Sequence, residues 1–202
     1  EKPYRSPYTA ETRVTSLTGS QPGAPFCGES VLRDIDQALA EHRPDFVYYP
    51  DSADDHPDHW AAHCLIQLAL ERRALAGRAP AMQRRTYLIH RGEWPTPMRA
   101  EPSMSLSPPV ELRGRGARWE QAPLGAAAVA AKVKALGAYR SQQALAGNFL
   151  SAFVRRNELT AHWPDADRGF PAARSSAPDS DLYASGGAVL FNSPAIRTSS
   201  AE

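Results

Sequence analysis

The chain has 202 residues, of which 42% are hydrophobic and 22% charged, a composition typical of a globular protein with one domain and a sizeable core. Its 23 basic and 22 acidic residues leave a formal net charge of +1, which gives no reason to expect a nucleic acid or an anionic membrane as partner. The longest apolar stretch, at 123–131, is too short to span a bilayer. Cys27 and Cys64 lack metal-type spacing, so we expect free thiols and, by default, a cytoplasmic location.

The first half of the sequence predicts an alternation of helices and strands. Residues 1–28 are polar and rich in turn formers, and they are expected to form an irregular lead-in. Residues 30–42 place apolar side chains on one helical stripe, and Pro44 then disfavours helical geometry. The run FVYY at 46–49 is continuously apolar, which is typical of a strand covered on both faces.

A second helix is predicted at 59–75 and a second strand, RTYLIH, at 85–90. A strand, a helix and another strand in this order are expected of a parallel sheet in an α/β protein. Ligands of such sheets bind beyond the carboxyl ends of the strands. The segment after FVYY lies at such an end.

The second half is less regular. Residues 91–124 are rich in proline and glycine and predict a long functional loop, with a solvated linker as the alternative. Helices are predicted at 126–142 and near 149–159. Residues 161–202 read as a turn-rich tail with one possible strand, AVLF, at 188–191.

The segment DDHPDHWAAH at 54–63 gathers histidines and aspartates where the first strand meets the second helix. His56 and His59 are three residues apart, and His63 follows four later. Histidine and aspartate are common zinc ligands, and Pro57 suits the first turn of a helix. This predicts a metal or catalytic site, and the alternative is an acidic loop that caps the helix.

His63 permits two interpretations. With His59 it has the i, i+4 spacing that can chelate a metal on one helix face. However, it stands beside Cys64 on the predicted packed face of the helix, which favours a buried, hydrogen-bonded histidine.

The stretch YYPDSADDHPDHWAA at 48–62 resembles the second signature of the LmbE-like, PIG-L-type zinc N-deacetylases, in which Asp-x-His-Pro-Asp-His opens a helix. TYLIHRGEWPTP at 86–97, KVKALGAYRSQ at 132–142 and FLSAFVRRNEL at 149–159 resemble later segments of the same family. The resemblance implies a deacetylase domain over 29–160, with a Rossmann-like three-layer sandwich and a mostly parallel sheet, incomplete at its amino end.

Carried over residue by residue, the resemblance makes His59 a ligand of zinc, or of another divalent metal. It makes His56 the histidine that stabilises the oxyanion and the leaving group. Asp58 and Asp54 match acidic positions, where they would orient the histidines, with Asp54 also near the substrate. Gln142 matches a helix position that can face the substrate, although a surface amide is the other interpretation.

The implied reaction is metal-assisted hydrolysis of the acetamide of an N-acetylated sugar, such as an N-acetylglucosaminyl conjugate. Bound zinc would lower the pKa of water from about 15.7 toward about 7. His56, if cationic, would donate to the oxyanion or protonate the amine. Trp94 and Trp119 in the predicted loop would suit stacking on a sugar. A non-catalytic remnant of the fold and another metallohydrolase, such as a phosphoesterase, are the alternatives, and no phosphate-cradling glycine loop supports the latter.

One departure from the family is large. Its first signature, Pro-His-Pro-Asp-Asp-Glu, supplies two further zinc ligands and the general base, but residues 1–28 contain no histidine. We therefore expect the chain to represent the carboxyl-terminal two thirds of a domain, as a processed or truncated product. Asp54, Asp55 and His63 could complete only a makeshift metal site. The sequence does not predict an oligomeric state.

Overall fold

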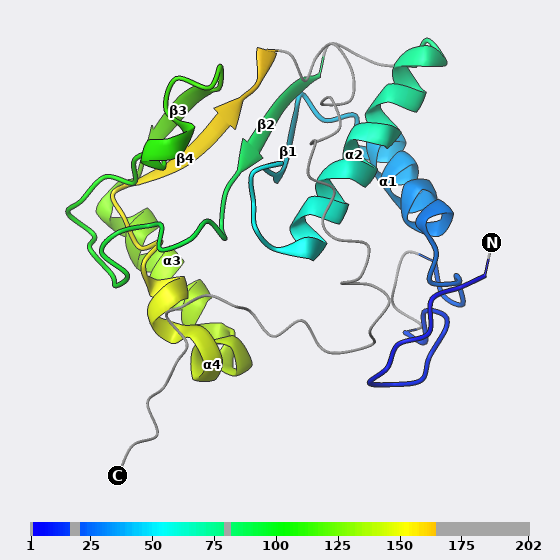
Figure 1. Ribbon diagram of the computed structural model, residues 1–202, viewed down its shortest axis with the longest axis horizontal. Helices are drawn as coiled ribbons and strands as arrows, with labels where there is room; N and C mark the ends of the chain where they lie inside the picture. The colour runs from blue at the N-terminus through cyan, green and yellow to red at the C-terminus, as the bar shows by residue number, and fades with distance from the viewer. Residues whose placement is uncertain (1, 17–20, 79–81, 165–202) are drawn as a thin grey trace. The chain divides into compact units, whose positions relative to one another are not determined.

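The computed structural model describes residues 2–16, 21–78 and 82–164. The chain contacts divide it into two compact units, Glu1–Tyr87 and Leu88–Glu202, where the sequence suggested one domain over 29–160. Helices and strands occur in both units (Figure 1).

The first helix of the first unit forms where the apolar stripe predicts it. Helix α1 spans Gly28–His42 and buries Leu32 and Leu39. It ends at Arg43, whose backbone is left-handed with φ of 43° and whose N–H returns to the carbonyl of Leu39. Helix α1 packs against helix α2.

The second half of the same unit is a strand–helix–strand segment. Strand β1 covers Phe46–Pro50, helix α2 covers Pro57–Leu75, and strand β2 covers Gln83–Tyr87. The two strands pair in parallel, from Phe46 opposite Gln83 to Pro50 opposite Tyr87. The predicted parallel strand pair with a connecting helix is therefore confirmed, but the second strand ends at Tyr87 and does not extend to residue 90. The expectation that both faces of β1 are covered is wrong, because Phe46 and Tyr48 are exposed.

Polar side chains make up much of the packed face of α2. Leu70 is buried as expected, but so are His63 and Gln67. The amide of Gln67 donates to the hydroxyl of Tyr49 at 2.9 Å, and the Tyr49 side chain is only 1% exposed. These polar groups can be buried because they bond to one another and to the adjoining strand.

The second unit contains an antiparallel strand pair. Strand β3 spans Arg118–Pro123 and strand β4 spans Asn157–His162, with Arg118 opposite His162 and Pro123 opposite Asn157. The other elements are a short 3₁₀ helix, η1 at Val110–Leu112, and helices α3 at Ala126–Ala138 and α4 at Arg140–Ser151.

Several expectations for this unit are wrong. The predicted loop 91–124 contains β3, and the helix predicted near 149–159 ends at Ser151 and gives way to β4. The helix predicted at 126–142 is interrupted at Tyr139. The predicted strand at 188–191 lies outside the described residues. The fold is a mixed α/β fold. Among the described strands, β1 and β2 pair in parallel in the first unit, and β3 and β4 pair antiparallel in the second. The mostly parallel sheet expected of a three-layer sandwich is therefore not observed among these strands.

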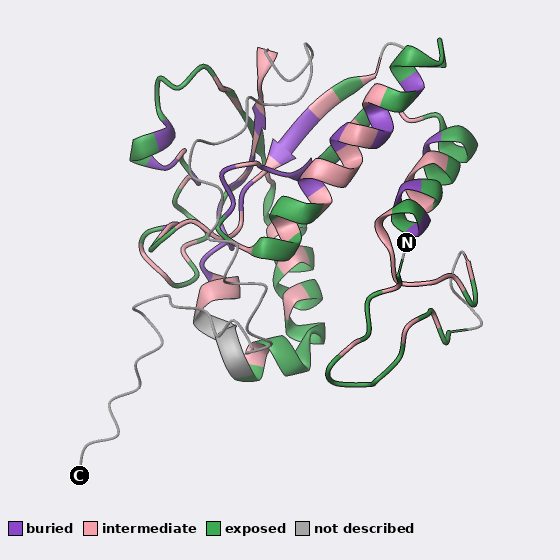
Figure 2. Ribbon diagram, turned by 45° about the vertical axis from the view of Figure 1, so that its right-hand side comes forward, coloured by how far each residue is buried: buried purple, intermediate pink, exposed green. Residues whose placement is uncertain are grey.

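The core of the second unit is built around β4. Buried Leu106, Phe153 and Leu159 form its centre. Ile89, Trp94, Trp119 and Phe149 pack against it partly buried. Figure 2 shows buried residues interspersed with exposed ones along the elements of both units. No helix in the described parts of the chain is long and apolar enough to cross a bilayer.

Candidate active-site loop

The loop between β1 and α2 is anchored by a buried aspartate. Asp51 is 0% exposed and follows the last residue of β1. Its Oδ1 accepts the N–H of Ala53 at 2.8 Å, and its Oδ2 accepts the hydroxyl of Thr86 at 2.5 Å. The backbone N–H of Asp51 also donates to the carbonyl of Tyr87. These bonds fasten the start of the loop to the carboxyl end of β2.

Asp54 organises the rest of the loop. Its side chain is fully buried, and its Oδ1 accepts the backbone N–H of His56 at 3.0 Å. Its Oδ2 lies 3.1 Å from Nδ1 of His59, whose side chain is 28% exposed. The carboxylate of Asp54 therefore lies against a histidine on the first turn of α2. Because the two ring nitrogens lie on different sides of an imidazole, Nε2 of His59 is directed away from Asp54.

His56 caps the amino end of α2. Its Nδ1 accepts the backbone N–H of Asp58 at 3.1 Å, and Pro57 occupies the first turn. A ring nitrogen that accepts a hydrogen bond carries no proton, so the proton of neutral His56 is on Nε2. The cationic form considered from the sequence would break this cap. Neutral His56 nevertheless presents one N–H donor.

The two histidines form a pair at the helix start. Their ring centroids are 4.9 Å apart, with an interplanar angle of 35°. Asp58 is exposed, and its backbone N–H donates to Nδ1 of His56 at the start of α2. The structure thus brings together Asp54, His56 and His59, with the backbone of Asp58 beside them.

His63 is a structural residue. It is only 4% exposed, and its Nδ1 lies 2.8 Å from the carbonyl oxygen of Pro50. Its ring contacts that of Tyr49 at a centroid distance of 5.4 Å. The interpretation of His63 as a buried, hydrogen-bonded histidine is therefore confirmed.

Tyr87 lies at the carboxyl end of β2 and was not singled out from the sequence. Burial raises the pKa of its phenol, and the negative charge of Asp54 raises this pKa further. Because the charge of Asp54 acts on the phenol of Tyr87, the carboxyl end of β2 is part of the electrostatic environment of the loop. Tyr87 falls inside the strand predicted at 85–90, so the sequence did not mark it as the residue that ends the strand.

Three residues predicted to contact the substrate, Trp94, Trp119 and Gln142, belong to the second unit, and Trp119 packs partly buried against its core. Trp94 donates its indole N–H to the carbonyl of Ser107 at 2.8 Å, and its ring packs edge-on against Phe153 at 5.5 Å. Gln142 is exposed on α4. Trp94 thus has a packing role of its own, and substrate binding by Trp94, Trp119 or Gln142 stays a prediction.

The loop residues fit one position of a metal site. Nδ1 of His59 lies 3.1 Å from the carboxylate of Asp54, which leaves Nε2 as the ring nitrogen that can bind a metal. The carboxylates of Asp51 and Asp54 are already bonded within the loop, and Nδ1 of His63 faces Pro50. Within residues 2–16, 21–78 and 82–164, no group of three or more His, Cys, Asp or Glu side chains is placed to hold a metal. The described residues therefore do not form a complete metal site.

The fold and the loop define an α/β protein with a histidine–aspartate cluster at the carboxyl end of a parallel strand. No protein-family model matches the sequence, and no curated protein matches it. Among solved structures, the chain is similar to the crystal structure of the antimicrobial reagent A40926 pseudoaglycone deacetylase, with 19% identity and a TM-score of 0.45. The similarity covers 67% of this chain and 55% of that one, so the chain spans about half the length of that structure.

Proposed function

We propose that this chain carries part of the active site of a metal-dependent hydrolase that removes the acetyl group from an N-acetylated sugar. The single observation behind the proposal is the joint arrangement of Asp54, His56 and His59 at the carboxyl end of β1. The same residues carry the Asp-x-His-Pro-Asp-His resemblance to the N-deacetylases. Motif and geometry therefore support the same chemistry.

His56 is proposed as the hydrogen-bond donor to the reacting amide. The cap at Nδ1 holds its proton on Nε2, which can donate to the oxygen that becomes negative during attack on the carbonyl. Two hydrogen bonds restrain His56. Its backbone N–H donates to the carboxylate of Asp54, and Nδ1 of its ring accepts the backbone N–H of Asp58. A donor held in place before the reaction stabilises the transition state without further reorganisation.

His59 is proposed as one ligand of a divalent metal, most simply zinc. When bound, such an ion polarises the amide carbonyl and activates water. Because the described residues provide only this one suitably oriented imidazole, the remaining ligands and the general base must come from residues other than these.

An activity assay tests the role of His56. The protein that contains this chain is incubated with N-acetylglucosaminyl conjugates and Zn²⁺, and acetate release is measured. His56→Ala is expected to reduce the rate by a factor of about 10²–10³, the usual effect of losing one oxyanion donor. His42→Ala, at an exposed histidine in the last turn of α1, is the matched control and should retain full activity. Equal rates for both variants would contradict the assignment.

A metal titration separates the proposed hydrolase from a non-catalytic remnant. Stoichiometric Zn²⁺ binding that His59→Ala abolishes and His42→Ala leaves intact would support an active metal site. Binding that His59→Ala leaves unchanged would reject His59 as ligand. If the entire protein binds no divalent metal, the non-catalytic remnant is the better description. Hydrolysis of phosphate esters in place of acetamides would favour a phosphoesterase.

A further inference from the structure

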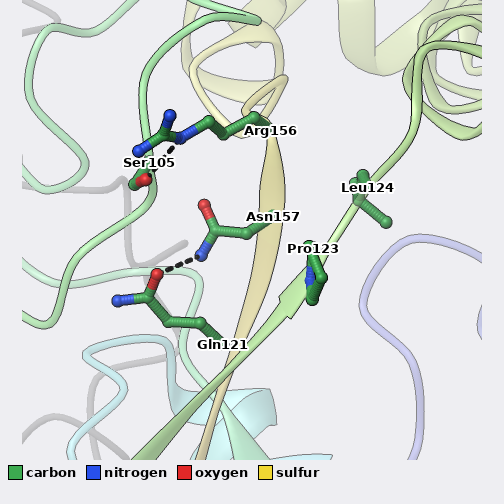
Figure 3. A pocket seen from close by; sticks show the side chains of 6 residues that line it. All are labelled: Ser105, Gln121, Pro123, Leu124, Arg156 and Asn157. Atoms are coloured by element: carbon green, nitrogen blue, oxygen red, sulfur yellow. Dashed lines mark hydrogen bonds between the residues drawn. The ribbon is translucent and has the colours of Figure 1, made fainter.

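A pocket in the second unit has no role in the proposed hydrolysis. Its volume is about 460 Å³, and it is lined by Ser105, Gln121, Pro123, Leu124, Arg156 and Asn157. Figure 3 shows the side chain of Asn157 extending from the start of β4 and that of Arg156 from the residue before it. Gln121 and Pro123 lie on β3, and Ser105 lies on a separate segment. The pocket therefore lies beside the paired ends of the two antiparallel strands.

The guanidinium of Arg156 is held in place within this pocket. Its Nε donates to Oγ of Ser105 at 2.7 Å (Figure 3). Its backbone N–H bonds to the carbonyl of Met104, and its backbone carbonyl accepts the N–H of Leu124. Arg156 is exposed, and none of the carboxylates in the described parts of the chain pairs with it. A restrained guanidinium has two further nitrogens that can bind the two oxygens of one anion.

The other polar groups of the pocket are arranged so that donors predominate. Ser105 accepts from Arg156, so its own O–H proton can be donated. Oε1 of Gln121 lies 3.4 Å from Nδ2 of Asn157, which leaves the Gln121 NH₂ as a donor. The side chain of Asn157 makes two hydrogen bonds to the backbone of Leu106. Its Oδ1 accepts the N–H of Leu106 at 2.7 Å, and its Nδ2 donates to the carbonyl of Leu106 at 3.0 Å. The lining contains no acidic side chain.

Pro123 and Leu124 add apolar side chains to the lining of the same pocket. Inorganic phosphate, which is hydrated on every side, would gain little from those side chains. A carboxylate attached to a small aliphatic group would use both the guanidinium and the apolar surface. From this we infer that the pocket binds a small organic carboxylate, with Arg156 contacting its two oxygens. The inference does not depend on the proposed deacetylase function.

The test is a titration of the whole chain with butanoate, followed by amide chemical shifts. Saturable shifts confined to residues around Ser105 and Arg156 are expected, and Arg156→Gln should weaken binding about tenfold or more because a charged hydrogen-bond partner is lost. Ser105→Ala should weaken binding less, since it removes only the group that positions the guanidinium. Arg118→Gln, at an exposed arginine at the other end of β3, is the matched control and should bind as the unmodified chain does.

Two further ligands make the inference specific. Butanamide, which has the same shape but no charge, should bind much more weakly, and inorganic phosphate should bind more weakly than butanoate. Equal binding of butanamide would show that the guanidinium plays no part, and equal binding of phosphate would overturn the role of the apolar side chains. Absence of saturable shifts, or equal losses in Arg156→Gln and Arg118→Gln, would overturn the site itself. Thermal unfolding of each variant confirms that its fold is retained.

Discussion

Oδ2 of Asp54 lies 3.1 Å from Nδ1 of His59, across the start of helix α2. The other oxygen of the same carboxylate accepts the N–H of His56. One fully buried side chain therefore contacts the ring of one histidine and bonds to the backbone of the other. This relationship makes the loop a defined arrangement rather than a solvated acidic turn.

Asp54→Ala should destabilise the protein by about 1–3 kcal/mol, because the N–H of His56 would lose its acceptor in a buried setting. Asp54→Asn retains one carbonyl oxygen for that N–H and should cost less. Urea denaturation followed by circular dichroism gives both values. Asp45→Ala, at an exposed aspartate before β1, is the control and should change stability little. A loss in Asp54→Ala no greater than in this control would show that the loop does not depend on Asp54.

The cap made by His56 has its own measurable contribution. His56→Ala should reduce the free energy of unfolding by about 1 kcal/mol, the typical cost of removing a side chain that caps a helix. His56→Asn should recover most of this loss, because an asparagine oxygen can accept the same N–H of Asp58. Denaturant titrations of the two variants provide the comparison. Similar stability of the alanine and asparagine variants would rule out the cap as the cause.

Tyr87 predicts a loss of stability at alkaline pH. Burial first, and then the charge of Asp54, raise its pKa above the ordinary value near 10. The unfolded chain therefore releases the phenolic proton at lower pH than the folded chain does. The contribution of Tyr87 is fully present below about pH 10 and is lost as the pH rises through the folded-state value.

Tyr87→Phe should flatten this decline, and Asp54→Asn should move the pKa of Tyr87 part of the way back. Tyrosinate absorbance and urea denaturation across alkaline pH measure the two effects. Burial also raises the pKa of Cys64, whose titration would add to the same alkaline decline. The unmodified chain, Tyr87→Phe and Asp54→Asn are therefore all compared in a Cys64→Ala background. If Tyr87→Phe left the alkaline decline unchanged on that background, the effect would belong to another group.

Asn157 is expected to be a stability determinant of the second unit. It is 3% exposed, and its side chain bonds to both the N–H and the carbonyl of Leu106. Asn157→Ala leaves both backbone groups without that partner and should cost about 1–3 kcal/mol. Asn157→Asp keeps the acceptor but loses the donor. Hydrogen exchange at the Leu106 amide should therefore quicken far more in the alanine variant than in the aspartate variant, and equal protection in both would contradict this.

The first unit follows closely from its sequence. The apolar stripe of α1, the continuous run of β1 and the position of Pro57 at the start of α2 are local signals, and each element forms where they predict it. The second unit departs at 149–159, where FLSAFVRRNEL is compatible with a helix. There, Asn157–His162 forms a strand because it pairs with β3, more than thirty residues earlier in the chain. Local periodicity carries no information about such a distant partner.

The same division applies to the loop. The spacing of Asp54, His56 and His59 along one short segment predicts that they gather at the end of a strand, because such spacing is a local property. Folding sets three contacts that this spacing does not predict: Asp54 lies against His59, Nδ1 of His56 caps α2, and Nδ1 of His63 lies against the carbonyl of Pro50. The direction of a side chain depends on which donors and acceptors the folded backbone brings within about 3 Å, and that distance is set by the packing of the helix on its strand.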